Sequence, residues 1–262
     1  MPSDIISVRD FSFAFGKKAI LKNITLAAPE GAYLSVIGPN GAGKTTLLKC
    51  VNRILAGGTG EIVVAGRPLR EYSQRELARV LSYVPQAEGR SAPFTVREFV
   101  TMGRYPYFTP FSSVRARDRE AVAEALDITG TTAFADRPLA TLSGGERQRV
   151  FIAAAVAQAG RVMLLDEPTT FLDPKHQVEI HALLRRLHRE RGVTIVSVTH
   201  DVTAAVLYSD LILALKNGAV AFIGPASEIL APGRLEGIYE VAFHRAANPA
   251  GGQPFVFPAG PA

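Results

Sequence analysis

Hydrophobic and polar residues alternate along the first part of the 262-residue chain. A period of two over 5–15 and again over 20–28, with Gly16-Lys17-Lys18 between them, predicts a hairpin of two strands. A helical pattern covers 43–54. Short uninterrupted apolar runs predict buried strands. These runs are 33–37, 61–65 and 81–84.

The pattern changes over 88–160, where helical spacing replaces strand-like runs. Helices are predicted there at 95–104, 115–127 and 146–159. Beyond this segment, strands are predicted at 161–166, 194–199, 211–215 and 219–223, with a helix at 174–191. An α/β core is therefore interrupted by a helical insert and then resumes.

This pattern divides the chain into four parts. We expect an N-terminal β region and the first part of the core at 1–87, a helical subdomain at 88–160, and the second part of the core at 161–248. The remaining residues, 249–262, are rich in Pro and Gly and predict a loosely attached tail with one short strand at 255–257.

Composition and charge narrow the class of protein. The chain is 47% hydrophobic and carries a net charge of +5, and no apolar stretch approaches the roughly 20 residues of a membrane span. Its basic residues are dispersed, and the densest run, 185–191, ends a predicted helix where the macrodipole favours cations, so we expect no nucleic-acid partner. The single cysteine, Cys50, excludes an internal disulfide, and its apolar neighbours predict buried packing. Because the first residues lack the layout of a signal peptide, we expect a cytoplasmic chain.

The strongest motif follows the apolar run 33–37. It fits the pattern G-x-x-x-x-G-K-[ST] of a phosphate-binding loop. Glycines let backbone N–H groups face the phosphates, Lys44 supplies a positive charge, and the Thr45 hydroxyl can ligate Mg²⁺. A Gly-rich turn that precedes a lysine by chance is the alternative, and the strand-to-helix setting disfavours it. The predicted nucleotide-binding residues are Gly38, Pro39, Asn40, Gly41, Ala42, Gly43, Lys44, Thr45 and Thr46.

Two carboxylates end the predicted strand at 161–166. Asp166 lies where a phosphate-loop ATPase places its second Mg²⁺ partner. Glu167 points elsewhere by the strand's period of two, and it can accept a proton from an attacking water. Two exposed acids at a strand end are the alternative, but this edge of an open α/β sheet is where ligands bind.

A second anion-binding segment is predicted at Ser143-Gly144-Gly145-Glu146, where glycines begin a helix and leave N–H groups bare beside a hydroxyl. One nucleotide does not need two phosphate cradles. The second cradle therefore more plausibly serves a nucleotide that another copy of the chain holds.

These motifs, in this order, resemble the ATPase subunit of ABC transporters over almost the whole chain. The resemblance implies a phosphate-loop core of the ABC ATPase type, with an N-terminal antiparallel β region and a helical insert. It implies ATP and Mg²⁺ as cofactors. It also implies a head-to-tail homodimer, in which the segment at 143–146 closes over the ATP of the opposite protomer.

The resemblance assigns roles to four further residues. Gln86 matches the glutamine that links Mg²⁺ and water to the transport domains, and Asp173 ends the loop that contacts the partner protomer. His200 matches the histidine at the γ-phosphate, although a lone histidine at a strand end is more often a packing residue or cap. Phe15 matches the aromatic residue that stacks on adenine, and a core position in the first hairpin is its alternative.

Finer features favour an importer. Residues 135–141 do not resemble the acid-containing segment of ABC exporters, whereas 95–106 and 167–177 are similar to the ATPases of ferric-siderophore, haem and cobalamin importers. Two departures are Glu146, where many relatives have Gln, and Pro174-Lys175, where an apolar pair is usual. An importer ATPase implies separate transmembrane permease subunits, indirectly a substrate-binding protein, and peripheral attachment at the cytoplasmic face of the inner membrane.

Three alternatives remain open from the residues. The chain could serve an importer of another solute, or be a mechanical ABC ATPase that acts on DNA or a protein assembly. The latter would be favoured by a long coiled coil or a second cassette, and neither is present. An ordinary phosphate-loop kinase would leave 142–149 unexplained.

Aromatic residues crowd the helical insert. We expect Phe99 to belong to its core, and part of the cluster from Tyr105 to Phe111 to be exposed beside Gln86, where it would suit docking of a membrane partner's helix. The crowded residues are Phe94, Phe99, Tyr105, Tyr107, Phe108 and Phe111.

Overall fold

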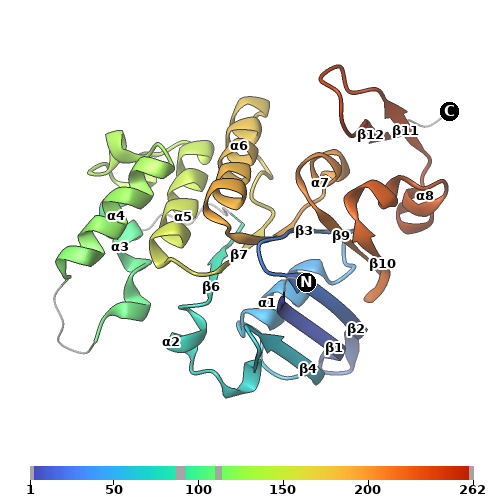
Figure 1. The fold of residues 1–262 in the computed structure, drawn as a ribbon, viewed down its shortest axis with the longest axis horizontal. Helices are drawn as coiled ribbons and strands as arrows, with labels where there is room; N and C mark the ends of the chain where they lie inside the picture. The colour runs from blue at the N-terminus through green and yellow to red at the C-terminus, as the bar shows by residue number, and fades with distance from the viewer. Residues whose placement is uncertain (1–2, 87–92, 110–113, 260–262) are drawn as a thin grey trace. The chain divides into compact units, whose positions relative to one another are not determined.

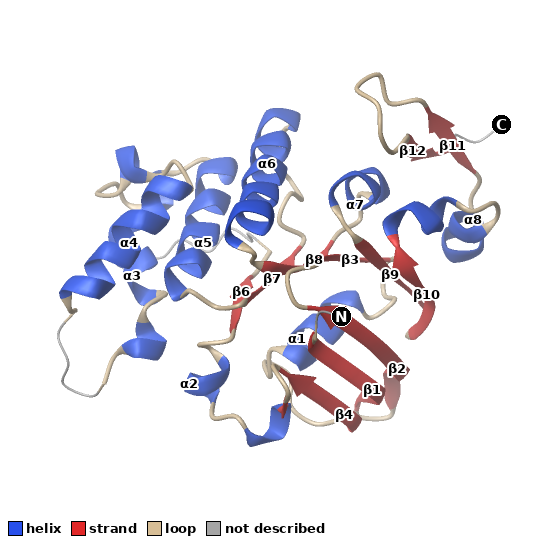
Figure 2. Cartoon of the chain, viewed as in Figure 1, coloured by secondary structure: helices blue, strands red, loops and turns tan. Residues whose placement is uncertain are grey.

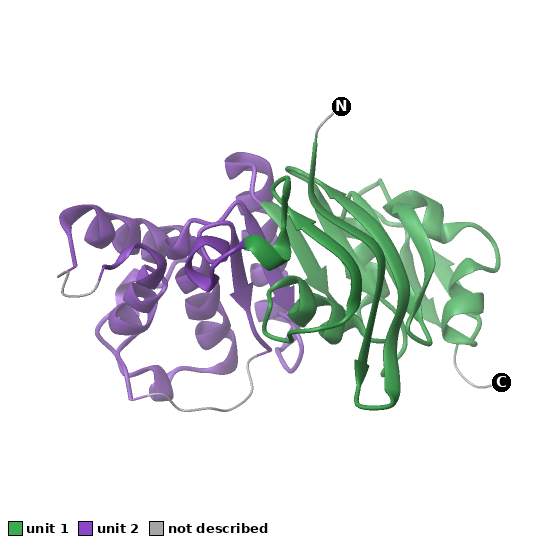
Figure 3. Cartoon of the chain, turned by 90° about the horizontal axis from the view of Figure 1, so that it is seen from below, with its two compact units in different colours: residues 1–71, 194–262 green, residues 72–193 purple. Residues whose placement is uncertain are grey.

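The computed structural model describes residues 3–86, 93–109 and 114–259. The chain divides into two compact units, of which the first combines Met1–Glu71 with Thr194–Ala262 and the second is Tyr72–Val193 (Figure 3). Both units contain strands and helices (Figure 2). None of the helices in the described ranges is both long enough and apolar enough for a membrane span.

The first unit begins with a four-stranded antiparallel sheet. Its order is β2-β1-β4-β5, formed by β1 (Asp4–Phe15), β2 (Lys18–Pro29), β4 (Thr59–Val64) and β5 (Arg67–Pro68) (Figure 1). Ile6 and Val8 of β1 are buried and pair in register with Val64 and Ile62 of β4. The predicted hairpin is confirmed, whereas β5 is too short for a periodic signal.

A second sheet of the same unit carries the phosphate loop. β3 (Tyr33–Ile37) runs parallel to β8 (Thr194–Val198) on one side and to β9 (Leu211–Lys216) on the other. β10 (Ala219–Pro225) pairs antiparallel with β9. Every residue of β3 and β8 is buried, including the polar residues Ser35, Thr194 and Ser197, as is usual for strands of a parallel sheet. Helix α1 (Lys44–Val51) follows β3 and ends before the predicted residue 54, because Arg53 adopts a left-handed φ of 54°.

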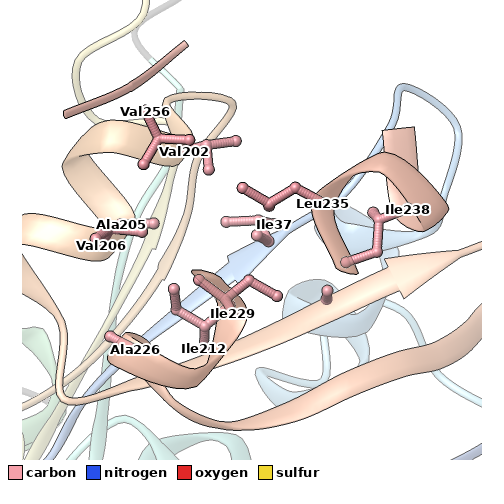
Figure 4. Packing of buried hydrophobic residues seen from close by; sticks show 11 residues of the cluster. Ile37, Val202, Ala205, Val206, Ile212, Ala226, Ile229, Leu235, Ile238 and Val256 are labelled. Carbon is pink, nitrogen blue, oxygen red and sulfur yellow. The ribbon is translucent and has the colours of Figure 1, made fainter. Parts of the chain in front are cut away.

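The C-terminal part of the first unit packs on the end of β3. It consists of α7 (Val202–Tyr208), the short 3-10 helix η5 (Ala226–Leu230), α8 (Arg234–Tyr239), β11 (Phe243–Ala246) and β12 (Phe255–Pro258). Ile37, Leu235, Ile238 and Val256 share one buried cluster (Figure 4). The short strand predicted at 255–257, as the exception to a loosely attached tail, is confirmed. β12 pairs with β11, and Val256 is buried.

The second unit contains two parallel strands and most of the helices. Its strands are β6 (Leu81–Val84) and β7 (Val162–Asp166), paired in parallel. Its α-helices are α2 (Gln74–Leu77), α3 (Val96–Met102), α4 (Ala116–Ile128), α5 (Gly144–Gln158) and α6 (Pro174–Arg191). Its 3-10 helices are η2 (Tyr105–Tyr107), η3 (Thr132–Phe134) and η4 (Leu139–Thr141), and the first unit has η1 at Leu69–Glu71.

Helices α3, α4 and α5 enclose the core of the second unit. Val96, Val122 and Val150 are buried there, and Phe99 packs against this cluster as predicted. A buried ion pair between Arg104 and Asp118 (3.2 Å) lies at the edge of the core. The described residues of the predicted 88–160 subdomain thus belong to one unit with β6, β7 and α6, and the four-part division stays a prediction.

Candidate functional site

The phosphate loop joins β3 to α1 in the first unit. Gly38 has a φ of 139°, and a Cβ there would lie 2.1 Å from the carbonyl oxygen of Leu215. Gly43 has a φ of 98°, and a Cβ there would lie 2.7 Å from the side chain of Leu21. Both positions require glycine for conformation and for space, so the two fixed glycines of the motif shape the loop before any nucleotide binds.

Lys44 lies inside the loop rather than in solvent. Its side chain is buried, and Nζ donates hydrogen bonds to the carbonyl oxygens of Gly38 (2.8 Å) and Pro39 (3.0 Å). Thr45 and Thr46 are half-buried beside it at the start of α1. The loop therefore holds a cation at its centre, a charge that complements phosphate oxygens.

The first turn of α1 has no cap of its own. Gly43 occupies the N-cap position without a side-chain hydrogen bond, and the first turn contains no acidic residue. Helix α7, by contrast, is capped by the Asp201 carboxylate, which accepts from the Ala204 N–H at 2.8 Å. The start of α1 thus has neither a capping side chain nor an acidic residue that would compete with an anion, and its role as the phosphate cradle stays a prediction.

His200 and Phe15 lie at the ends of two other strands of the first unit. His200 follows β8, whose register with β3 brings the carboxyl ends of both strands to one edge, with the Thr199 N–H bonded to the Val36 carbonyl at 3.1 Å. Phe15 ends β1, is 53% exposed, and meets Phe13 edge to face at 5.0 Å. An open ring face is what stacking on a base requires, and the stacking itself stays a prediction.

The second unit brings the predicted carboxylates and glutamine together. β6 and β7 end side by side, with Val84 opposite Leu165. Beyond these ends, Gln86 Nε2 donates to Glu167 Oε2 at 3.2 Å. Asp166 is 4% exposed at the end of β7. The pairing of parallel strands thus gathers three of the residues that the sequence singled out.

Glu167 is directed by a strained turn, not by strand alternation. β7 ends at Asp166, and Glu167 adopts a left-handed φ of 52°, so the argument from the strand's period of two is wrong. Thr170 Oγ1 then donates to the Glu167 carboxylate at 3.0 Å. Left-handed φ angles at residues other than glycine are costly and are common at functional sites.

Sequence reasoning missed two residues of this cluster. Tyr83 donates its hydroxyl to Asp166 Oδ2 at 3.1 Å, and burial raises the pKa of Tyr83, so the phenol keeps its proton. Thr170 donates to the same Glu167 oxygen, Oε2, as Gln86 does. The sequence did offer one signal for Tyr83, which lies three positions before Gln86. Side chains near the ends of two paired strands lie close together, so Tyr83 could have been expected near Asp166.

The segment at 143–146 begins α5 with a complete capping box. The Ser143 hydroxyl accepts from the Glu146 N–H (3.3 Å), and the Glu146 carboxylate accepts from the Ser143 N–H (2.8 Å). Hydrogen bonds from Ser143 to the Glu146 carboxylate hold the pKa of Glu146 below its ordinary value, with the bond from the Ser143 backbone the largest cause and that from its side chain the next. The N–H groups of Ser143 and Glu146 are therefore bonded within the segment. The expectation of bare N–H groups at the two glycines stays a prediction.

Gly144 and Gly145 meet the loop around Asp173. A Cβ at Gly145 would lie 2.1 Å from the imidazole of His176, and one at Gly144 would meet Leu172 at 3.5 Å. His176 Nδ1 is 2.7 Å from the Asp173 carboxylate, which also caps α6 by accepting from the His176 N–H at 3.0 Å. That backbone hydrogen bond is the largest cause that lowers the pKa of Asp173.

The predicted aromatic patch is partly present at the end of α3. Tyr105 is 71% exposed, as expected, while Phe108 is half-buried and Phe111 lies outside the described residues. Met102, Tyr105 and Phe108 line an apolar hollow with residues of α3. Docking of a membrane partner at this patch stays a prediction.

Comparison with known proteins relates these features to a family. The model of the ABC transporter family matches residues 21–170. The chain is similar to the ferric enterobactin transport ATP-binding protein FepC of Escherichia coli. The two are 38% identical over an alignment that covers 95% of this chain and 92% of that protein. It is also similar to the iron(3+)-hydroxamate import ATP-binding protein FhuC of Bacillus subtilis. These two are 36% identical over an alignment that covers 95% of this chain and 93% of that protein.

Solved structures agree with this assignment. The fold matches an inward-facing ABC transporter of proposed metal-chelate type, with a TM-score of 0.85, 27% identity and 98% of each chain covered. It also matches the dimeric cassette MJ0796 bound to ADP and Pi, with a TM-score of 0.72, 29% identity, 84% of this chain and 98% of that one. The chain belongs to the ABC transporter family, as one of its ATP-binding, ATP-hydrolysing subunits.

Proposed function

We propose that the chain hydrolyses ATP to energise uptake of a metal chelate, a ferric siderophore in the first place, through separate transmembrane permease subunits. The observation that carries this proposal is similarity along 95% of the chain to transport ATPases for ferric enterobactin and ferric hydroxamates. Petrobactin import ATP-binding proteins of Bacillus anthracis and Bacillus subtilis are also 39% identical. Haem and cobalamin are further chelates of the same broad class.

The phosphate loop, in this proposal, binds the nucleotide. Lys44 exchanges the carbonyl oxygens of Gly38 and Pro39 for the phosphate oxygens of ATP, and the N–H groups at the start of α1 bind the same anion. His200 contacts the γ-phosphate, and Phe15 stacks on the adenine.

Magnesium fits the residues that the sequence assigned to it. The hydroxyl of Thr45, the carboxylate of Asp166 and the amide oxygen of Gln86 are hard oxygen donors, which Mg²⁺ prefers. Tyr83 already supplies the buried Asp166 with one hydrogen bond, which orients the carboxylate. When bound, Mg²⁺ would neutralise charge on the phosphate oxygens.

Glu167 is the proposed general base. Gln86 and Thr170 hold its carboxylate in a fixed position, and its strained backbone turns it away from the strand direction of Asp166. A carboxylate held in this way can accept a proton from the water that attacks the γ-phosphate.

A second copy of the chain completes each nucleotide site in this proposal. Ser143, Gly144, Gly145 and Glu146 close over the ATP of the opposite protomer in a head-to-tail homodimer, and Asp173 contacts that protomer. The closed dimer acts on permease subunits from the cytoplasmic face of the inner membrane, and a substrate-binding protein delivers the chelate on the other side.

Reconstitution tests this function. The chain would be co-purified with its membrane subunits and placed in proteoliposomes, together with the binding protein. ATP-dependent uptake of a ferric siderophore, haem or cobalamin is expected, and the Glu167→Gln variant should abolish it. Uptake of only an amino acid or a sugar would overturn the proposal, even if the ATPase were fully active.

A further inference from the structure

The first residue of the phosphate loop is bonded to a residue that follows it by 201 positions. The Gly38 N–H donates a hydrogen bond of 3.0 Å to the hydroxyl oxygen of Tyr239, the last residue of α8. Both residues belong to the first unit. A backbone N–H at this depth needs a partner, and the phenol supplies one that no motif in the sequence indicates.

Gly38 is held on three sides. Its N–H is bonded to Tyr239, and its carbonyl oxygen accepts from Lys44 Nζ at 2.8 Å. Its α-carbon faces the backbone of Leu215 so closely that a Cβ would lie 2.1 Å from the Leu215 carbonyl oxygen. The point where β3 becomes the phosphate loop is therefore fixed by a strand, a lysine and a tyrosine.

Tyr239 is itself fixed. Its ring packs against the buried cluster that contains Ile37, Leu235 and Ile238. It also meets the ring of Phe243 at 5.6 Å. Lys216, the residue after Leu215, donates to the Gly237 carbonyl oxygen at 2.7 Å and pairs with Glu240 at 2.6 Å. The end of β9 thus contacts both the loop and the helix that carries Tyr239.

The phenol is a constant partner over the physiological pH range. Burial raises the pKa of Tyr239 to about 12, while the hydrogen bond from Gly38 acts in the opposite direction. Its hydroxyl therefore remains a neutral phenol, whose oxygen accepts from the Gly38 N–H.

We propose that Tyr239 is a positioning residue for ATP binding: its hydroxyl holds the Gly38 N–H, so that the phosphate loop is shaped before the nucleotide arrives. The C-terminal segment from α8 to β12 then contributes to ATP binding indirectly, because it carries the residue that holds the phosphate loop. The inference rests on the proposed role of the phosphate loop.

The test removes one oxygen atom. Tyr239→Phe keeps the ring and its packing but leaves the Gly38 N–H without its partner. Titration of the purified chain with a fluorescent ATP analogue should show an affinity about 3–10-fold weaker, the effect of one lost hydrogen bond. The KM for ATP should rise by the same factor, while kcat stays unchanged, because Tyr239 contacts none of the proposed catalytic residues.

Tyr33→Phe is the matched control. Tyr33 begins β3, in the same unit, and its buried hydroxyl is bonded to Ser197 rather than to the loop. The control should lower thermal stability at least as much as Tyr239→Phe while leaving ATP affinity unchanged. An equal loss of affinity in both variants would show a general weakening of the unit and overturn the inference.

Amide exchange measures the contact itself. Labelling with carbonyl-¹³C isoleucine and ¹⁵N glycine selects the Ile–Gly pairs of the sequence, Ile37-Gly38 and Ile223-Gly224. In Tyr239→Phe, exchange at Gly38 should become faster, while exchange at Gly224, which lies in β10, should not change. Unchanged exchange at Gly38 together with unchanged ATP affinity would overturn the inference.

Lys44→Ala separates this inference from the proposed function. If Lys44→Ala abolishes ATP binding and Tyr239→Phe does not weaken it, the loop binds the nucleotide and only the role of Tyr239 is wrong. If Lys44→Ala leaves binding intact, the proposed role of the loop is itself wrong, and the inference falls with it.

Discussion

Helices α1 and α5 begin in opposite ways, although the sequence marks both starts as phosphate cradles. Helix α1 starts at Gly43 with no side-chain cap and no acidic residue in its first turn. Helix α5 starts at Ser143 with a complete capping box, and Glu146 lies in its first turn. The first start has no side-chain cap, whereas the second bonds the N–H groups of Ser143 and Glu146 within the segment and adds a negative charge.

The two helix starts differ in what a ligand would have to displace. At α1 there is no side-chain cap, whereas at α5 a ligand would have to replace hydrogen bonds of the capping box. The α1 cradle already has its cation, Lys44, and its uncapped N–H groups in place. At α5, the phosphate that we propose to bind there would compete with the Glu146 carboxylate and with the Ser143–Glu146 bonds. We therefore expect ATP to bind first at α1, and the α5 segment to engage only when dimer closure supplies enough free energy to replace its cap.

The largest effect should come from Glu167→Gln. Glutamine keeps the size of the side chain but cannot accept a proton, so ATP hydrolysis should fall roughly 10²–10⁴-fold while ATP still binds. The trapped nucleotide should drive stable dimers in size-exclusion chromatography with ATP and Mg²⁺, in which the α5 segment is engaged. A variant that hydrolyses ATP at the normal rate would refute the role of Glu167.

Removal of the cation at α1 should be the next largest effect. Lys44→Ala should weaken ATP binding by the isolated chain at least about 100-fold, because a charge-assisted contact to phosphate is lost in a buried setting. Isothermal titration calorimetry measures the change. Lys49→Ala, in the last turn of the same helix, is the control and should bind ATP normally.

A change at α5 should spare binding and block closure. Ser143→Arg should leave ATP affinity of the monomer within about twofold, yet reduce hydrolysis roughly 10–10²-fold, because the proposed donor to the partner's ATP is replaced by a bulky side chain. Ser143→Thr, which keeps the hydroxyl, should stay active. If Ser143→Arg weakened ATP binding by the monomer as much as Lys44→Ala does, the proposal that α5 acts only on the partner's ATP would be wrong.

The charge of Glu146 should have a smaller effect of the opposite sign. Glutamine also completes a capping box, so Glu146→Gln removes only the negative charge near the partner's phosphates. In the Glu167→Gln background, half-maximal dimerisation should need about 2–5-fold less ATP, the size expected for one exposed charge–charge interaction. High salt should erase the gain by screening. An unchanged ATP requirement at low salt would mean that Glu146 lies too far from the phosphates to matter.

The smallest effect should be a pH dependence of stability. Hydrogen bonds from Ser143 lower the pKa of Glu146, so its contribution is complete above the ordinary Glu pKa of about 4.3 and is lost as the pH falls through the lowered value. Thermal unfolding from pH 6 down to about pH 3 should therefore cost the wild type about 1–3 °C more than Glu146→Gln. Identical pH profiles would exclude a stabilising role for this carboxylate.

Local sequence signals predicted the elements that are long or fully buried. Residues 33–37 and 174–191 have the predicted bounds, because one is an uninterrupted apolar run and the other begins at a proline after an Asp cap and ends before a glycine. Helices α7 and α8 were not predicted, since seven and six residues are too few for a clear helical period.

The candidate site was predictable where a motif depends on local geometry. Gly38 and Lys44 fall in a loop whose shape follows from its own glycines. The direction of Glu167 was not predictable by strand alternation, because the chain turns left-handed at that residue. The bond from Gly38 to Tyr239 joins residues 201 positions apart, and no local pattern carries such a contact.

The residues that can stand at position 145 depend on the residue at position 176. The imidazole occupies the volume that any side chain at 145 would need, and it also bonds to Asp173. A methyl group at 145 would have to displace the ring and disturb the cap of α6, so Gly145→Ala should become tolerable only with a smaller residue at 176. The start of α5 and the start of α6 therefore have to be redesigned together. Paired substitutions at 145 and 176 offer a way to alter the proposed dimer interface of the cassette.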